Sequence, residues 1–587
     1  MTTHLLDRFI AQPGARLACI VDGERLTYAD LRARVNAQAC ALASRGVGAD
    51  DIVAFDALRR ADTLALLLAI LHLGAAYLPL DPALPAERRR QILDDAQPRL
   101  VAEPRDSPAS SACPASLCSG DLAYVLFTSG STGRPKGVAM RAAAVAALID
   151  WHVAHPRLGK PARTLHFAPL SFDVSFQEIL STFATGGTLV VANDSERRDP
   201  WAMLDLIERE RIERAFLPYV ALQAIADAAM GAGRAPPTSL IDVVTAGEQL
   251  RITPAIRALF ASLPNAVLHN HYGPTEAHVV TAHELAGDSA RWPDLPPIGQ
   301  ALPHVRVRLG DDDAADEGEL LLGGDCLARG YINRPELTAE RFIERDGQRW
   351  YRTGDNVRRD ANGTLDYIGR LDDQIKLAGY RIEPAEIEAV IGRHPHVAQV
   401  AVVAVGTGSE KRLAAHIVPR DGTTTHAELI GELQRMCAAA LPAYMVPQEF
   451  AVHALLPLTA SGKIDRRRLA HEEAQAGIAW NDGAPLAEQI ASLWKQLLGV
   501  AQLGVNANLF DHGARSLMVV QALTELRRRG HVLSVAQVYE HPTIAAQVAL
   551  LSEPKTTTTA PDDGRGERQR AALSRFARGD TTWMRAR

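Results

Sequence analysis

Two hydrophobic patterns alternate along the first half of the chain. Short apolar runs suited to β-strands occupy residues 188–192, 241–246 and 266–269. Between and after them, residues 201–211 and 253–263 place apolar side chains at helical spacing. Because strands that alternate with helices build layered domains, this part of the chain predicts an α/β fold.

The pattern becomes helical near the C-terminus. Residues 486–498, 516–528 and 536–551 carry apolar residues at helical spacing and predict a compact all-α unit. The preceding stretch, residues 481–485, has the sequence NDGAP and predicts a linker. Residues 553–587 begin with a threonine run and predict a flexible tail.

Length and composition favour a cytoplasmic enzyme of several domains. A chain of 587 residues is too long for one core, and its 47% hydrophobic content can supply several. A net charge of -6 and a pI near 6.4 give no reason to expect binding to nucleic acid or to a membrane. No signal peptide is recognised before Leu5. The apolar run Leu64–Leu71 is too short to cross a bilayer and predicts a buried helix.

One loop carries the strongest chemical signal. Residues 121–137 read DLAYVLFTSGSTGRPKG, so an apolar strand leads into a loop rich in glycine and hydroxyl groups. Glycines let the backbone approach an anion, and hydroxyls and a lysine provide donors and positive charge. The loop predicts a phosphate site, formed by Thr128, Ser129, Gly130, Ser131, Thr132, Gly133 and Lys136. A flexible surface loop is the alternative for such a motif in isolation.

The motif does not stand alone, and the chain resembles the adenylate-forming superfamily, in particular the adenylation domains of nonribosomal peptide synthetases. The matching segments follow one another in the family's order: Leu26–Leu31, Leu73–Asp81, residues 121–137, Phe172–Ser175, Asn270–Glu276, Gly318–Leu320, Ala328–Tyr331, Tyr351–Asp355, Gly369–Lys376, Gly379–Glu383, Leu441–Pro447 and Pro457–Asp465. The resemblance spans roughly residues 10 to 470.

The resemblance implies a domain organisation. Residues 1–371 are expected to form a large α/β adenylate-forming subdomain and residues 372–474 a small, mobile α+β subdomain, with Asp372 at the hinge position. A linker at residues 475–485 leads to an all-α four-helix carrier domain at residues 486–552. Residues 553–587 form the basic tail.

The same resemblance assigns roles in ATP-dependent adenylation. Lys463 is the expected principal cation between substrate carboxylate and α-phosphate, where negative charge develops. Glu276, which follows Thr275, matches the family's magnesium ligand, and a hard cation prefers carboxylate oxygen. Asp355 is expected to bind the ribose hydroxyls and Tyr272 to stack on adenine. Tyr367 and Arg370 are expected to support the nucleoside, although packing or an ion pair would also account for them.

The helical unit resembles a peptidyl carrier domain. Residues 508–517 read NLFDHGARSL, and Ser516 matches the serine that bears phosphopantetheine. A phosphodiester is favoured at a helix N-terminus by the free N–H groups there. A plain N-cap is the alternative for Ser516. Arg515 stands where the family usually has His or Asp, which leaves open the modifying enzyme, a phosphopantetheinyl transferase, and the downstream partner.

Asp173 indicates the substrate class. It matches the position that pairs with the α-ammonium of an amino acid, and a buried carboxylate is costly without such a cation. Fatty and aryl acids have no ammonium, so Asp173 favours an amino acid over the substrate of an acyl-CoA ligase. The alternative is a loop aspartate that caps its own backbone.

The remaining pocket positions resemble the code of proline-activating domains. They are Val174, Gln177, Phe216, Val244, Ala246, His271, Val279 and Val280, with Lys463 completing the set. A mainly apolar, medium-sized cavity suits a compact ring without polar side-chain atoms, and Gln177 and His271 are able to hydrogen-bond each other. The alternative substrate is another small or cyclic apolar amino acid, such as pipecolate or valine.

The motifs present indicate a loading module. Neither a condensation motif nor a thioesterase elbow is recognised, so the chain is expected to load an amino acid for a downstream oxidase or condensing protein. A carrier scaffold with an inactive adenylation domain is disfavoured by intact Lys136, Glu276, Asp355 and Lys463. Tail residues Leu573 and Phe576 would share one side of a short basic helix, which suggests docking to an acidic partner.

Overall fold

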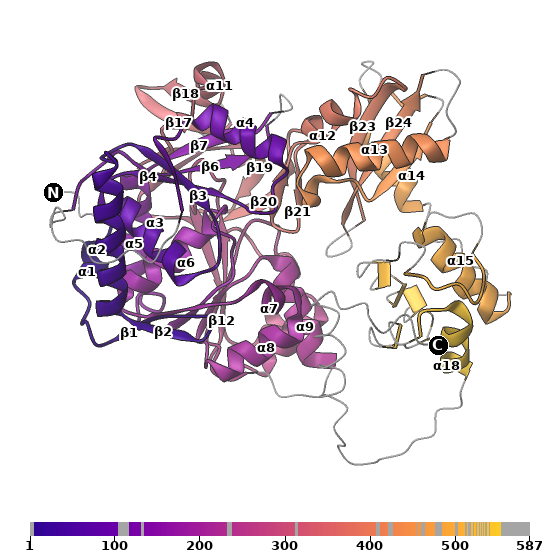
Figure 1. The fold of residues 1–587 in the computed structure, drawn as a ribbon, viewed down its shortest axis with the longest axis horizontal. Helices are drawn as coiled ribbons and strands as arrows, with labels where there is room; N and C mark the ends of the chain where they lie inside the picture. The colour runs from indigo at the N-terminus through magenta and orange to yellow at the C-terminus, as the bar shows by residue number, and fades with distance from the viewer. Residues whose placement is uncertain are drawn as a thin grey trace, which may run out of the picture. The chain divides into compact units, whose positions relative to one another are not determined.

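The computed structural model describes residues 5–103, 117–130, 134–231, 237–310, 315–406, 411–420, 426–453, 455–458, 464–475, 484–498, 503–510 and, with gaps, 514–552. The chain divides into two compact units, residues 1–470 and 471–587. Figure 1 shows the helices and strands of both. None of the helices that the structure describes is long and apolar enough to cross a membrane.

The largest sheet of the first unit has nine strands in the order β14-β13-β12-β11-β10-β8-β9-β1-β2. Its strands are β1 (Leu17–Val21), β2 (Glu24–Thr27), β8 (Arg163–His166), β9 (Thr188–Val191), β10 (Arg214–Phe216), β11 (Asp242–Thr245), β12 (Val267–Tyr272), β13 (Thr281–Leu285) and β14 (Gln300–Ala301). The six strands from β12 to β1 run parallel, and both edges are antiparallel. The strands predicted at residues 188–192, 241–246 and 266–269 are therefore present as β9, β11 and β12.

A second sheet has six strands in the order β17-β7-β6-β4-β3-β5. They are β3 (Ile52–Asp56), β4 (Ala76–Leu80), β5 (Leu100–Ala102), β6 (Leu122–Thr128), β7 (Lys136–Arg141) and β17 (Gly330–Tyr331). The phosphate-loop motif lies in the hairpin from β6 to β7, whose register pairs Thr128 with Lys136.

Helices cover and separate these two sheets. They are α1 (Asp7–Ile10), α2 (Tyr28–Ser44), α3 (Ala61–His72), α4 (Ala86–Ala96), α5 (Ala142–Ala154), α6 (Val174–Thr185), α7 (Asp194–Arg198), α8 (Pro200–Arg209), α9 (Tyr219–Gly231), α10 (Pro254–Ala261) and the 3-10 turn η1 (Ser289–Arg291). Helix α3 is buried almost throughout, as its apolar sequence predicts.

Helix α6 connects the two sheets. It contacts β8 and β9 of the nine-stranded sheet. On the other side the Phe176 ring stacks on Tyr77 of β4, with ring centroids 4.4 Å apart, and contacts Tyr124 of β6. Since every residue from Ser175 to Thr185 is buried, α6 forms a fixed support for the residues at its N-terminus.

A third sheet, of five strands, follows along the chain. Strands β15 (Val305–Leu309), β16 (Glu317–Gly324), β18 (Phe342–Arg345), β19 (Gln348–Arg359) and β20 (Leu365–Arg370) form it, and α11 (Pro335–Arg341) precedes β18. Its long strand β19 carries Asp355.

Residues after this sheet build a separate hydrophobic core, here called the small core, whose buried members lie within residues 375–445. The elements here are β21 (Ile375–Leu377), β22 (Tyr380–Ile382), α12 (Pro384–Ile391), β23 (Val397–Val405), β24 (Arg412–Pro419), α13 (His426–Ala440), η3 (Ala443–Met445), β25 (Glu449–Val452) and α14 (Arg466–Gln475). The predicted boundary at residues 371 and 372 falls between β20 and β21.

The second unit is helical where it is described. Helix α15 (Leu486–Leu498) and helix α18 (Ile544–Ser552) pack together, and Trp494 Nε1 donates to Gln547 Oε1 at 2.8 Å. The prediction of one helix over residues 536–551 was wrong, because α18 begins only at Ile544. Pro542 lies in the break; it has no N–H to donate and disfavours helix in the residue before it.

Candidate active site

Two buried clusters and one cavity bring the predicted residues of the first unit together. The first cluster surrounds Glu276, whose side chain is 0% exposed. Lys136 Nζ lies 3.3 Å from Oε1 of this carboxylate, and Arg381 Nη1 donates to Oε2 at 2.6 Å. The Tyr331 hydroxyl donates to Oε1 at 2.7 Å. Burial alone would raise the pKa of Glu276, but Arg381 and Lys136 hold it well below the ordinary carboxyl value.

The phosphate loop begins beside this cluster. Thr128 ends β6, and its hydroxyl is buried without a partner among the described residues. At Gly130 an added Cβ would lie 1.9 Å from the Arg134 carbonyl oxygen, so the turn requires glycine. Ser131, Thr132 and Gly133 lie outside the described residues.

These groups fit a magnesium-bound triphosphate. The orphan Thr128 hydroxyl, the Lys136 ammonium and the Gly130 N–H are donors for phosphate oxygens. The Glu276 carboxylate offers the oxygen that magnesium prefers. Thr275 lies in the turn just before Glu276 and is half-buried.

The second cluster surrounds Asp355, which is 1% exposed. Arg370 Nη1 lies 2.8 Å from its Oδ1, and Lys376 Nζ lies 3.5 Å from its Oδ2. Burial would raise the pKa of Asp355, yet Lys376 and Arg370 together keep it below the ordinary value. The carboxylate is therefore ionised and positioned by two cations.

Two tyrosines complete this cluster. The Tyr272 hydroxyl donates to Asp355 Oδ2. The Lys376 ammonium lies 5.3 Å from the ring centroid of Tyr272 and 5.2 Å from that of Tyr367. Asp355, Arg370, Lys376, Tyr272 and Tyr367 thus lie together. That this cluster binds the nucleoside, with Tyr272 stacked on adenine, stays a prediction.

The predicted hinge residue Asp372 follows directly. Its two carboxylate oxygens accept from Arg370 Nε at 2.8 Å and from Arg370 Nη2 at 2.6 Å. Arg370 therefore links the carboxylate of Asp355 to that of Asp372.

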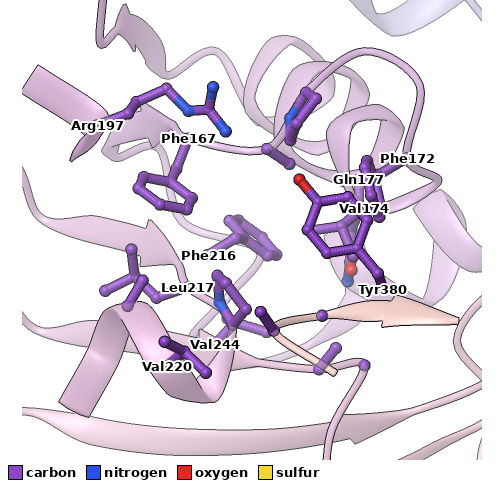
Figure 2. A pocket seen from close by; sticks show the side chains of 18 of the residues that line it. Phe167, Phe172, Val174, Gln177, Arg197, Phe216, Leu217, Val220, Val244 and Tyr380 are labelled. Atoms are coloured by element: carbon purple, nitrogen blue, oxygen red, sulfur yellow. The ribbon is translucent and has the colours of Figure 1, made fainter. Parts of the chain in front are cut away.

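The cavity lies at the carboxyl ends of the parallel strands. Residues just after β8, β10, β11 and β12 line it, which is where open α/β sheets place ligands. Its volume is about 360 Å³. Figure 2 shows Phe216 between Gln177 and Val174 on one side and Arg197 on the other. The predicted pocket residues Asp173, Val174, Gln177, Phe216, Val244, Ala246 and Val279 all line it.

Asp173 stands at the start of α6. Its Oδ1 accepts the Val174 N–H at 2.8 Å, so it caps the helix. It is half-buried, and it forms no ion pair with any residue that the structure describes. A carboxylate in this position can pair with a ligand cation while it retains the cap.

Two predicted pocket residues, His271 and Val280, do not line the cavity. His271 is buried beside Trp151, and its Nδ1 lies 3.5 Å from Gln177 Nε2. Val280 is fully buried in the main hydrophobic core. His271 lies on β12, and Val280 lies just before β13. The neighbour of Val280, Val279, lines the cavity instead.

Lys463 and Ser516 lie outside the described residues, as does the whole tail from residue 553. Sequence reasoning missed the roles of Lys376, Arg381 and Tyr331. All three stand inside motifs that we recognised, Ala328–Tyr331, Gly369–Lys376 and Gly379–Glu383. Their burial beside carboxylates is the signal that the sequence alone does not carry.

Three family models match most of the chain. Residues 6–113 and 102–332 match the family "AMP-binding enzyme", and residues 386–463 match "AMP-binding enzyme C-terminal domain". Residues 488–551 match "Phosphopantetheine attachment site".

Individual relatives agree with these matches. The malpinin synthetase of Mortierella alpina is 33% identical over 95% of this chain, and the phosphinothricin tripeptide synthetase PhsB of Streptomyces viridochromogenes is 36% identical, also over 95%. The chain spans only 8% of the first relative and 49% of the second.

A solved structure shows the same organisation. Holo-PA1221, described as a nonribosomal peptide synthetase protein containing adenylation and PCP domains, is 27% identical with a TM-score of 0.73. That match covers 94% of this chain and 96% of the other. The chain therefore belongs to the AMP-binding enzymes and is an adenylating ligase of the nonribosomal peptide synthetase type, with a carrier domain for phosphopantetheine after its two adenylation subdomains.

Proposed function

We propose that this protein activates L-proline with ATP and transfers the prolyl group to phosphopantetheine on Ser516. The observation that carries the choice of substrate is the cavity, where Asp173 stands in an otherwise mainly apolar lining. It is the only carboxylate among the described residues that line the cavity. An amino acid would place its ammonium beside Asp173 and its side chain against the apolar wall.

The lining favours a compact apolar side chain. Phe216 and Val244 belong to one buried cluster, and the half-buried Val174 packs against it. The Gln177 amide contacts His271, which does not line the cavity. Part of the hydrogen-bonding capacity of this amide is therefore used away from the substrate. A pyrrolidine ring has no polar side-chain atom that would need a partner there.

The residues of the two clusters would act on the reacting groups as follows. The amino acid carboxylate forms a bond to the α-phosphorus of ATP while the bond to pyrophosphate breaks. Lys136 and Lys463 would neutralise the charge that develops there. Asp355 would hold the ribose, with Arg370 and Tyr367 fixing its orientation. Magnesium, when bound at Glu276, supplies further charge neutralisation.

Transfer requires the second unit and a change of position. Phosphopantetheine on Ser516 supplies the thiol that accepts the acyl group. We propose that Asp372 is the point about which residues 372–474 rotate between the two steps. In the structure Ala378, Gly379 and Tyr380 line the same cavity as Asp173, as transfer would require.

Amino-acid-dependent exchange of pyrophosphate into ATP tests this proposal. We expect proline to give the highest exchange among the proteinogenic amino acids. Pipecolate and valine would reveal a close analogue as the true substrate. Exchange above a blank with another amino acid but not with proline contradicts the proline assignment. Exchange only with acids that lack an amine would instead favour an acyl-CoA ligase.

The partners are proposals of the same kind. A phosphopantetheinyl transferase would modify Ser516, and an oxidase or condensing protein would receive the loaded carrier. The basic tail would dock this partner electrostatically, so transfer to it should slow at high salt.

A further inference from the structure

A short segment beside the small core forms hydrogen bonds with the phosphate loop. It comprises residues 381–386, from β22 to the first turn of α12. Ser129 Oγ donates to the Arg381 carbonyl oxygen at 2.6 Å and accepts the Glu383 N–H at 3.0 Å. The Gly130 N–H donates to the Glu386 carboxylate at 3.2 Å.

This carboxylate is buried and paired. Glu386 is 2% exposed, and its second oxygen accepts from Arg88 of α4. A buried carboxylate that accepts a loop N–H and faces an arginine presents the same chemistry as a phosphate oxygen. The Glu386 carboxylate thus takes the place of a phosphate oxygen at the Gly130 N–H.

The magnesium ligand has a matching occupant. Arg381 reaches Glu276 Oε2 at 2.6 Å, and its Nε donates to Gln374 Oε1 at 2.6 Å, which fixes its direction. A guanidinium on this oxygen excludes a metal ion from it. Residues 381–386 therefore bring one cation and one anion to the two places that magnesium and a phosphate would fill.

We propose that Arg381 and Glu386 are positioning residues that take over the magnesium and phosphate contacts once pyrophosphate has left. Glu276 and Gly130 then have alternating partners: magnesium and phosphate during adenylation, and Arg381 and Glu386 during transfer. Because Glu386 and a phosphate cannot both accept the Gly130 N–H, magnesium pyrophosphate and the observed arrangement exclude each other. The segment would hold the small core in place for transfer and oppose the return of pyrophosphate.

The inference rests on the adenylation chemistry proposed above, but not on the choice of proline. Magnesium pyrophosphate can be titrated into the full-length protein by calorimetry without ATP or amino acid. Replacing the competing carboxylate in Glu386→Gln should tighten this binding by about tenfold, because like charges no longer meet at the loop. Damage to the fold would weaken binding instead.

Two further variants make the result decisive. Glu388→Gln is the matched control, since Glu388 is on the same helix but its carboxylate binds Arg466 and the Val402 N–H; it should leave the affinity unchanged. Arg88→Met combined with Glu386→Gln removes both buried charges, so any gain does not come from a freed arginine. Affinity in the double variant equal to or weaker than that of the wild type overturns the proposal.

A second readout uses the loaded carrier. With pyrophosphate added after adenylation, the amount needed to halve carrier loading should fall about tenfold in Glu386→Gln. Equal sensitivity in both proteins contradicts the proposal. If no amino acid supports exchange at all, the function proposed above fails, yet the calorimetric result still decides the role of Glu386.

Discussion

Single side chains in this site depend on burial and pairing together. Glu276 and Asp355 are carboxylates inside the protein, and each meets two cations. Breaking a buried ion pair by removal of one partner typically costs about 3–5 kcal/mol, and here the second cation would retain part of the compensation. Their cations are therefore as important to the site as the carboxylates themselves.

Asp173 offers a test of the substrate class at a single atom. Asp173→Asn keeps an oxygen to cap the Val174 N–H but removes the negative charge. We expect kcat/KM for the amino acid to fall about 10- to 100-fold, because a hydrogen bond to a charged group contributes about 1.5–3 kcal/mol. Pyrophosphate exchange at varied amino acid concentration measures this.

A matched aspartate controls for loss of a cap. Asp288 accepts the Ala290 N–H at the start of η1. Asp288→Asn should leave exchange unchanged. A similar loss in both variants, or no loss in Asp173→Asn, argues against pairing of Asp173 with the ammonium.

The functional residues that could be predicted from sequence were those to which a recognised motif assigns a role. Asp355 and Glu276 each stand in a short run whose chemistry is recognisable. Lys376 and Arg381 stand in such runs too, but their partners lie 21 and 105 positions away. A contact over that separation depends on how strands β19, β21 and β22 and the turn after β12 are arranged, which local spacing does not specify.

Among the elements, α6 and the loop after β8 form one unit through Glu178. Its carboxylate accepts the Ala168 N–H at 3.0 Å and the Phe167 N–H at 3.2 Å, and it meets His166 Nδ1. Phe167 and Ala168 line the cavity. Burial raises the pKa of Glu178 to about 8, although these N–H groups act in the opposite direction.

This pKa predicts how stability depends on pH. The folded protein keeps the proton on Glu178 up to about pH 8, whereas the unfolded chain releases it near the ordinary carboxyl pKa. The contribution is therefore complete at acidic pH and is lost as pH rises to about 8, by at most about 1.4 kcal/mol per pH unit. The urea midpoint of the wild type minus that of Glu178→Gln should fall over this range and then level off. A difference that rises with pH contradicts the assignment.

The β6–β7 hairpin depends on glycine for its shape. Gly130→Ala places a methyl group against the Arg134 carbonyl, so the backbone of the loop must shift. A shift of about 1 Å at a reacting group can cost about 100-fold, and we expect a loss of this order in kcat/KM for ATP.

Gly48→Ala is the matched control, because an added Cβ there has nothing within 4 Å. It should behave as the wild type in exchange and in thermal unfolding. If Gly130→Ala has an unchanged KM for ATP, the loop does not hold the phosphates.

Helix ends were the least predictable feature. The apolar spacing over residues 536–551 continues through Pro542, so periodicity alone suggested one helix. The chain instead breaks at residues 541–543, and the Leu509 N–H donates to the Pro542 carbonyl at 2.9 Å. The helix-breaking effect of Pro542 outweighed the hydrophobic pattern here.

In the molecule as a whole, the buried hydrophobic residues form several separate cores. One hydrophobic cluster is shared by the nine-, six- and five-stranded sheets, and a second joins the nine-stranded sheet to helices α8, α9 and α10. Residues 375–445 form a third cluster, and the helical unit has a fourth around Trp494. Parts with separate cores can change position without unfolding. The hydrophobic pattern predicted the separation of the helical unit, since α/β alternation ends before the purely helical stretch. The core at residues 375–445 was expected only from the family resemblance.

The two proposed steps should therefore fail independently. Lys463→Ala should abolish most pyrophosphate exchange, because the charge that develops at the α-phosphate loses its principal cation. Ser516→Ala should leave exchange intact and abolish covalent loading, since its hydroxyl is the proposed attachment point in the other unit. Intact-mass spectrometry after treatment with CoA and a phosphopantetheinyl transferase measures attachment, and Ser492→Ala, on the exposed face of α15, is the matched serine control. A phosphopantetheine adduct that persists in Ser516→Ala refutes the attachment site, and normal exchange in Lys463→Ala refutes the role of the lysine.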